Sequence, residues 1–398
     1  MTVSQATDLY WDPYEIDLNM DPFPLFKRMR EEAPLYYNEK YDFYGLSRAD
    51  DVEQAFVDHK RMISGKSDIL EYIRAGIDWP QGFFIFEDPP QHTKHRGVLS
   101  RVFTPKKMNA LEPQVRDLCA RILDPFVGSG GFDFVNDFGG LVASRVIGML
   151  LGIPESDQAG IRAHVEASLQ NHDGEAAEID MANFEGDMYA DYIDWRMEHP
   201  SDDLMTSLLN VEFEDEHGTV RRLTREEILT FVTLLSGAGN DTTAKLIGWT
   251  GKLLSDHPDQ RRDLVEDSSL IPDAVEELLR YQPPGMQNAR YVTEEVDFSG
   301  GTVPADNVVV TIMASANRDD RRFPDGDRFD VHRKPAGMLT FAFGIHFCLG
   351  AALARLQGRV AMEEVLKRFP EWTVDEDRAV LRPTSTTRGY DSLPVVIP

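Results

Sequence analysis

The chain has 398 residues and the composition of a globular protein, with 42% hydrophobic and 27% charged residues. Its net charge of −27 argues against binding to nucleic acid or to an anionic membrane surface, because both require clustered lysine and arginine. Cys119 and Cys348 are too few for a disulfide framework. The opening 30 residues have neither a basic start nor an apolar core, and the longest apolar helical run, 228–240, is shorter than the ~18 residues of a membrane span. We therefore expect a cytoplasmic protein.

Helical spacing dominates the chain, with short strands near the start and in the last third. Thr224 and Glu227 form a capping box at the start of a long helix, and prolines end several others. No linker divides the chain, so we expect one domain over residues 1–398. The predicted helices cover 24–32, 111–127, 138–151, 187–198, 224–255, 273–281 and a segment from Cys348 to about 368, and the predicted strands cover 289–298 and 307–313.

The strongest local signal is the segment 341–350, which runs directly into a helix. A thiolate at Cys348 requires a lowered pKa, which the N–H groups and partial positive charge of a helix start provide. Gly344 permits a reverse turn before the cysteine, and Gly350 permits close approach of a flat macrocycle. A lone cysteine is more often a buried structural residue, but the ordered set of residues around Cys348 favours a ligand.

This segment resembles the haem-binding loop of the cytochrome P-450 family, which has the pattern Phe-x-x-Gly-x-x-x-Cys-x-Gly. Phe341, Gly344, Cys348 and Gly350 match every fixed position. The resemblance implies haem b with Cys348 as the axial ligand of its iron. It also implies a mainly α fold with a minor β component, a helix-rich triangular prism with a long central helix over the haem. The chain departs from many bacterial members at Ala342, where they have glycine, and at the bulky Phe343.

The long helix contains the segment Ala238, Gly239, Asn240, Asp241, Thr242, which resembles the family element that crosses the oxygen-binding face of the haem. The resemblance implies that Thr242 hydrogen-bonds the bound dioxygen and that Asp241 relays protons to it. A threonine can also bend a helix by bonding the carbonyl four residues back, so a bent structural helix is the alternative. We expect Gly237 to leave space above the iron.

Further matches to the family support this interpretation. Glu277, Arg280 and Arg328 match its structural triad, although an isolated Glu–Arg pair is usually a weak surface pair. His92, Arg96, Arg290 and His346 match cations around the two haem propionates.

The resemblance predicts a monooxygenase that inserts one atom of O₂ into a lipophilic small molecule, terpenoid, steroid or fatty-acid-like. A peroxide-driven peroxygenase and a non-catalytic haem or ligand-binding protein are the alternatives, and the Asp241–Thr242 pair speaks against both. The expected substrate-selecting segments are 61–86, 165–190, Met286–Gln287 and the turn around Thr386. The expected pocket residues are Ile85, Leu234, Gly237, Met286, Gln287 and Thr386.

The chain has no dinucleotide-binding fingerprint. Electrons are therefore expected from a separate ferredoxin and its NAD(P)H-dependent reductase, with the chain itself a monomer. Because such donors are acidic, a local basic patch is needed on the cysteine side. The candidates are Lys94, Arg101, Lys106, Lys107, Arg355 and Arg359.

Overall fold

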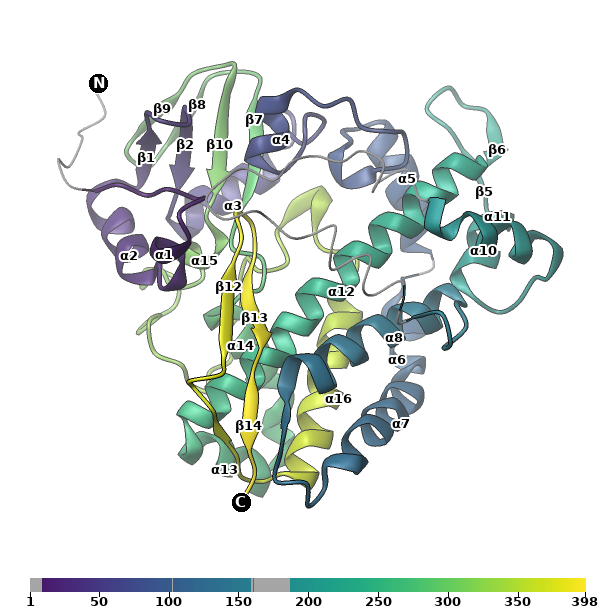
Figure 1. Cartoon of the computed structure of the whole chain (residues 1–398). Coiled ribbons are helices and arrows are strands. Elements are labelled where there is room, and N and C mark those ends of the chain that lie inside the picture. Colours follow the sequence, from purple (N-terminus) through teal and green to yellow (C-terminus); the bar gives the residue numbers. More distant parts are fainter. Residues whose placement is uncertain (1–8, 102, 159, 161–186) are drawn as a thin grey trace.

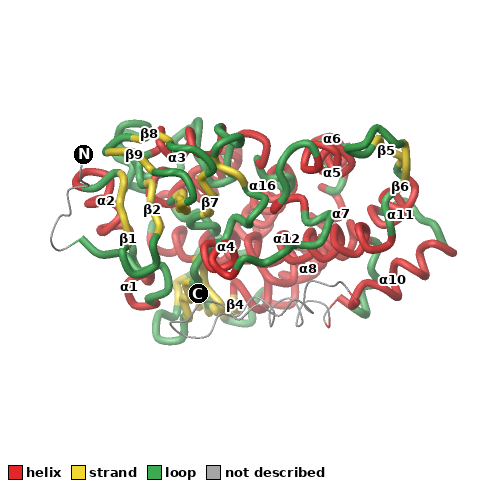
Figure 2. The backbone as a smooth tube through the Cα atoms, turned by 90° about the horizontal axis from the view of Figure 1, so that it is seen from above, coloured by secondary structure: helices red, strands yellow, loops and turns green. Residues whose placement is uncertain are grey.

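Helices make up most of the structure, as predicted, and the strands gather mainly at one side (Figure 1). This computed structural model describes residues 9–101, 103–158, 160 and 187–398. Seen from above, the larger sheet lies at one end and helices fill the other (Figure 2). The N-terminal helices pack around the sheet: α1 (Ile16–Met20), α2 (Phe23–Glu32), α3 (Ala49–Val57) and α4 (Leu70–Ala75).

The five-stranded sheet joins the start of the chain to its last third. Its order is β1 (Leu35–Asn38), β2 (Phe43–Leu46), β10 (Asn307–Thr311), β7 (Asn288–Val292) and β3 (Met62–Ile63). The β2–β10 pair is parallel and the other pairs are antiparallel. The valines of β10 are buried, as suits β-branched residues in a central strand. This sheet places β7, with Arg290, beside the segment that leads into α4.

The central helix α12 (Arg225–Asp256) organises the helical part. It begins at the predicted capping box, because Thr224 Oγ1 accepts from the N–H of Glu227 and the Glu227 side chain accepts from the N–H of Thr224. Most of its side chains are buried between α8 (Gly140–Leu151), α10 (Asp187–Glu198), α14 (Ile271–Tyr281) and α16 (Ala351–Arg368). The C-terminal ends of α10, α14 and α16, at Glu198, Tyr281 and Arg368, lie where the sequence predicts them.

The remaining helices are short or sit at the periphery. The predicted helix 111–127 ends early, at Leu123, because Pro125 follows and the chain turns into a 3₁₀ segment. The short and peripheral helices are η1 (Phe84–Phe86), α5 (Gln91–Ser100), α6 (Pro105–Ala110), α7 (Glu112–Leu123), η2 (Asp124–Phe126), α11 (Leu204–Asn210), α13 (Pro258–Glu266), η5 (Ser268–Leu270), α15 (Met313–Ala316) and η6 (Gly344–His346).

The other strands form small sheets. The hairpin of β12 (Val380–Pro383) and β13 (Arg388–Ser392) packs along α12 and carries the turn 384–387. The others are β4 (Gly131–Asp133), β11 (Thr373–Val374) and β14 (Pro394–Val396) in one sheet, and the hairpins β5 (Glu212–Glu214) with β6 (Val220–Arg222) and β8 (Val296–Phe298) with β9 (Gly301–Val303).

The most apolar helical stretch in the described residues is not the predicted 228–240. It is Phe134–Leu151, formed by the π-helix η3 (Phe134–Gly139) and α8, and by length and composition it could cross a membrane. In this structure 67% of it is buried, largely against α12. Gly251 of α12 makes room for it, since a Cβ there would lie 2.6 Å from the Phe134 ring. The stretch is thus a core helix of this fold.

Candidate functional site

The cysteine loop folds back on itself immediately before α16. The N–H of Cys348 donates to the carbonyl of Phe341 at 2.8 Å, which closes the loop. Gly344 has a φ of 69°, and a Cβ there would lie 2.6 Å from the carbonyl oxygen of Phe56 in α3, so this position requires glycine. Ala342 has a φ of 55°, a conformation that glycine adopts without strain. Alanine is strained in this conformation, but the loop still closes through the bond from the N–H of Cys348 to the carbonyl of Phe341.

The thiol of Cys348 lies in a mixed electrostatic environment at the start of α16. Desolvation raises the pKa of this thiol above its usual value, in contrast to the lowered pKa that the sequence suggests. The N–H groups of Gly350 and Ala351 and the charges of Arg96 and Arg355 oppose the rise but do not outweigh it. The side chain is nevertheless accessible, in contrast to the buried Cys119. A Cβ at Gly350 would approach only Cys348 Sγ, at 3.9 Å. This face of the loop therefore has the open approach that a flat macrocycle requires.

The middle of α12 presents a run of small and polar groups. Thr242 Oγ1 donates to the carbonyl of Ala238 at 2.9 Å, the local bond that the sequence suggests. Ala238 is exposed although it lies mid-helix. No atom of the described residues would lie within 4 Å of a Cβ at Gly237, so among these residues the space expected beside Gly237 is present. Gly239 lies against α8, where a Cβ would lie 2.4 Å from Ile147 Cδ1, so packing between helices requires a glycine here. Its expected place beside the cofactor stays a prediction.

Of the four residues predicted to hold the haem propionates, His92, His346 and Arg290 have few or no hydrogen-bond partners among the described residues. His92 and His346 stack with ring centroids 4.2 Å apart, and both ring nitrogens of His92 and Nε2 of His346 are buried without a hydrogen bond to a described residue. Arg290 is buried, and its guanidinium donates to its neighbour's carbonyl, that of Ala289. Arg96 donates to the carbonyl of Phe347. Buried donors need acceptors, and two carboxylates would supply them. These residues fit the propionates of the haem that the resemblance implies.

The charges of this cluster act on its histidines. Burial lowers the pKa of His92 to about 4, with a further contribution from Arg96. Burial also lowers the pKa of His346 to about 2, assisted by Arg290 and His92. A neutral histidine can still donate one N–H to a carboxylate.

Helix α5, which carries His92 and Arg96, is anchored by a buried ion network. His95 Nδ1 lies 2.8 Å from Glu87 Oε2, and its Nε2 lies 3.5 Å from Glu227 Oε1 at the start of α12. Burial alone would lower the pKa of His95, but Glu227 and Glu87 raise it to about 9. Burial alone would raise the pKa of Glu227, but Arg221 and His95 lower it to about 2. The network ties α5 to α12.

The structural triad needs one correction. Glu277 and Arg280 form a fully buried bidentate pair with both distances 2.7 Å. Arg328 does not join them: its side chain is 67% exposed and pairs with Asp330. Its carbonyl oxygen, which any residue could supply, accepts from Arg280. Arg333 takes the third place, with Nε 3.2 Å from Glu277 Oε1. The turn after Phe329 points Arg333 inward, and no local pattern distinguishes the two arginines.

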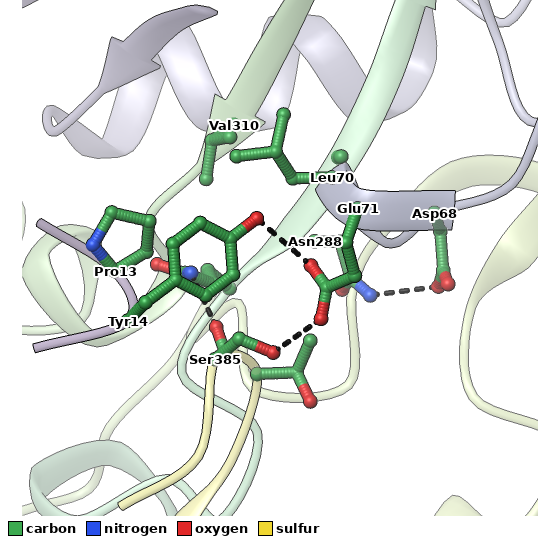
Figure 3. Close-up of a pocket in the computed structure, with 11 residues that line it drawn as sticks. Pro13, Tyr14, Asp68, Leu70, Glu71, Asn288, Val310 and Ser385 are labelled. Carbon is green, nitrogen blue, oxygen red and sulfur yellow. Dashed lines mark hydrogen bonds between the residues drawn. The ribbon is translucent and has the colours of Figure 1, made fainter. Parts of the chain in front are cut away.

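Two of the six predicted pocket residues line a pocket in the described part of the chain. Gln287 and Thr386 line a pocket beside α4, whereas Ile85, Leu234, Gly237 and Met286 lie outside it. The other polar residues of this pocket come from segments far apart in the chain (Figure 3). Asp68 and Glu71 lie within the predicted segment 61–86, and Ser385 lies in the predicted turn around Thr386. The sequence missed Tyr14 and Asn288. Of the predicted selector segment 165–190, residues 165–186 lie outside the described residues.

Two carboxylates, those of Asp68 and Glu71, line this pocket. Asp68 accepts from Asn288 Nδ2 at 2.7 Å, and burial raises its pKa to about 6 despite the opposing charge of Arg290. Glu71 accepts from Ser385 Oγ at 2.6 Å and from Tyr14 OH at 3.3 Å (Figure 3). The pocket thus carries two carboxylates among the apolar side chains of Pro13, Leu70 and Val310.

Half of the predicted basic docking residues are neutralised within the chain. Lys94 pairs with Glu214, Arg355 with Glu276, and Arg359 with both Glu112 and Glu363. Lys106 and Lys107 on α6 and the nearby Arg101 are exposed, with no ion pair to a described residue. Because α6 packs against α16, these three lie close to the helix that follows Cys348.

Comparison with known proteins agrees with this geometry. Residues 188–392 match the family model described as "Cytochrome P450". The chain is 35% identical over 400 residues to "Putative cytochrome P450 123" of Mycobacterium tuberculosis, covering 98% of this chain and 97% of that protein. It is 36% identical over 383 residues to "Vitamin D(3) 25-hydroxylase" of Pseudonocardia autotrophica, covering 95% and 94%. A solved structure of a mutant of P450 EryK in complex with erythromycin B superposes with a TM-score of 0.85 at 32% identity, covering 95% of this chain and 96% of that one. The predicted fold is confirmed.

Proposed function

Since the chain belongs to the cytochrome P450 family of haem-containing monooxygenases, we propose that it inserts one atom of O₂ into a lipophilic small molecule, with electrons from a separate ferredoxin and its NAD(P)H-dependent reductase. The observation that carries the proposal is a group of buried nitrogen donors beside an accessible thiol at a helix start. In this group His92 Nδ1, His92 Nε2 and His346 Nε2 have no hydrogen bond to a described residue. The relatives support a large lipophilic substrate, because one is named for vitamin D₃ and another is solved with erythromycin B.

In this proposal the chain's residues divide the work. Cys348 holds the haem iron, and His92, Arg96, Arg290 and His346 hold the propionates. When bound, the haem activates O₂, and electron density from the thiolate favours O–O cleavage. Thr242 Oγ1, whose own proton goes to the carbonyl of Ala238, accepts a hydrogen bond in the middle of α12. Asp241 beside it moves protons from solvent. The presence of this acid–alcohol pair favours O₂ over peroxide as the oxidant.

A direct experiment tests the proposal. The purified haem protein is screened against a library of steroids, terpenoids, macrolides and fatty acids for shifts of the Soret band. The binders are then turned over with ferredoxin, reductase and ¹⁸O₂. One ¹⁸O atom in the product supports a monooxygenase. Product formation with hydrogen peroxide alone, and none with O₂, would instead establish a peroxygenase.

Removing the acid–alcohol pair should separate oxygen consumption from product formation. We expect Thr242→Ala to release peroxide, because the site loses a hydroxyl that accepts a hydrogen bond. We expect Asp241→Asn to slow turnover on the order of 10²-fold, the contribution of a positioned proton donor. Both variants should keep the haem spectrum of the parent. Peroxide and product per NADH consumed are the measurements. Full coupling at the parental rate in both variants would exclude the relay.

The exposed cations of α6 should govern ferredoxin association. Lys106→Glu with Lys107→Glu is expected to slow ferredoxin-driven reduction about three- to tenfold at low salt, and the difference should shrink as salt rises. Arg359 is left unchanged, because a glutamate there would face Glu112 and Glu363.

The control carries the same charge change elsewhere, on Lys334 and Arg378, which are 83% and 73% exposed and lie outside α5, α6 and α16. Stopped-flow reduction is compared with reduction by dithionite, which should be equal in all variants. Equal ferredoxin kinetics in the α6 and control variants would show that the donor docks elsewhere.

A further inference from the structure

Lys245 lies one helical turn after Asp241 in α12 and forms an ion pair with it. Lys245 Nζ lies 2.6 Å from Asp241 Oδ2 and 2.6 Å from Thr387 Oγ1, although Thr387 is 142 residues away in the chain. The Lys245 side chain is 7% exposed, whereas exposed i,i+4 pairs are common and weak. A buried ammonium with two directional partners fixes the position of both.

The hairpin β12–β13 is shaped to receive this lysine. A Cβ at Gly389 of β13 would lie 2.3 Å from Cγ and 2.7 Å from Cβ of Lys245. Only glycine at this position lets the lysine stem pack along the strand and deliver its ammonium to Thr387. The ion pair is therefore built by the tertiary structure as well as by helical spacing.

Thr387 belongs to a turn whose residues Ser385 and Thr386 line the pocket beside α4. The turn is closed by the N–H of Thr384, which donates to the carbonyl of Thr387 at 2.7 Å. Its Ser385 donates to Glu71 of α4, which also accepts from Tyr14 (Figure 3). The N–H of Met286 donates to the carbonyl of Thr386 at 2.7 Å. A continuous set of contacts thus runs from α4 through the turn 384–387 to Lys245 and Asp241.

We propose that Lys245 is a positioning residue for Asp241, and that the turn 384–387 sets where Lys245 stands. The inference rests on the proposed function, because it assigns Lys245 to the acid of that same site. Lys245 acts by holding one carboxylate oxygen of Asp241, so that the side chain presents its other oxygen in one orientation. Loss of Lys245 leaves the carboxylate free to rotate, which slows proton delivery without removing the acid.

The pairing is tested first by NMR of the holoprotein in its diamagnetic ferrous carbon monoxide form, labelled with ¹⁵N-lysine. A buried, hydrogen-bonded ammonium should give a resolved signal. We expect one signal to be absent from Lys245→Met and to shift in both Asp241→Asn and Thr387→Val. A Lys245 signal that neither partner variant moves would overturn the pairing.

The positioning role is tested by a double-mutant cycle on NADH-driven O₂ consumption with saturating ferredoxin. Lys245→Met should slow the reaction about fivefold and increase its solvent deuterium isotope effect, and Lys245→Arg, which keeps the charge, should restore most of the rate. In the Asp241→Asn background the same change should alter the rate by less than about twofold, because the residue it positions is already gone. Thr387→Val should act in the direction of Lys245→Met.

A matched control exists on the same helix. Lys252 pairs with Asp256 at 2.7 Å, also four residues on, but near the end of α12. Lys252→Met should leave rate and isotope effect unchanged. Equal effects of Lys245→Met in the parent and in Asp241→Asn would overturn the inference while the relay stands. If Asp241→Asn itself has no effect, the relay fails and the role of Lys245 fails with it, although the NMR pairing remains.

Discussion

The Cys348→His variant is expected to lose completely the red-shifted Soret band of the ferrous carbon monoxide complex. That band reports a thiolate on the iron, because electron density from sulfur changes the electronic structure of the haem. Cys348 is the accessible one of the two cysteines, and it stands at the start of α16, where Gly350 and Ala351 direct N–H groups toward its sulfur. Imidazole is a neutral ligand and does not reproduce this donation.

Cys119→Ala is the matched control, because Cys119 is fully buried in α7 and belongs to the core. This variant should retain the band at full intensity per haem. Haem content is measured in parallel by the pyridine haemochrome, so that loss of the band is separated from loss of the cofactor. Retention of the band in Cys348→His would remove Cys348 as the ligand.

The second large effect is expected at the buried pair of Glu277 and Arg280. Arg280→Leu removes the bidentate partner of the buried Glu277 carboxylate and leaves it with only Arg333 and the N–H of Asp330, which should cost ~3–5 kcal/mol of the free energy of unfolding. Arg280 also donates to the carbonyls of Asn317 and Gly326, so the segment before the cysteine loop loses its anchors at the same time. The midpoint of urea unfolding, followed by circular dichroism, measures the effect.

Arg333 and Arg328 provide an internal comparison within one turn. Arg333→Ala should cost ~1.5–3 kcal/mol, the contribution of a hydrogen bond to a buried charge. Arg328→Ala removes an exposed pair with Asp330 and should cost less than ~1 kcal/mol. The reverse order would mean that Arg328 completes the triad in solution.

Several of these features could be predicted from the sequence because they are local. The capping box of Thr224 and Glu227 lies within one turn of helix, and the loop from Phe341 to Gly350 is closed by its own backbone. The predicted bond from Thr242 spans four residues. In each case the chemistry needs residue types at fixed short spacing, so the spacing itself carries the information. The i,i+4 spacing of Asp241 and Lys245 is a signal of the same kind, and it could have been found in the sequence.

The tertiary structure alone decided which partner each charged or small residue meets. Arg328 and Arg333 are equivalent in the sequence, and the course of the chain between them selects Arg333 for Glu277. Gly239 makes room for Ile147, because α8 packs against α12 there. Arg359 is neutralised by Glu112, and Glu71 is joined to Ser385 across 314 residues. Contacts between distant segments depend on how sheets and helices pack, and single-sequence patterns extend only a few residues. The sequence by itself therefore determined the closed cysteine loop and the long helices, and packing decided which residues surround them.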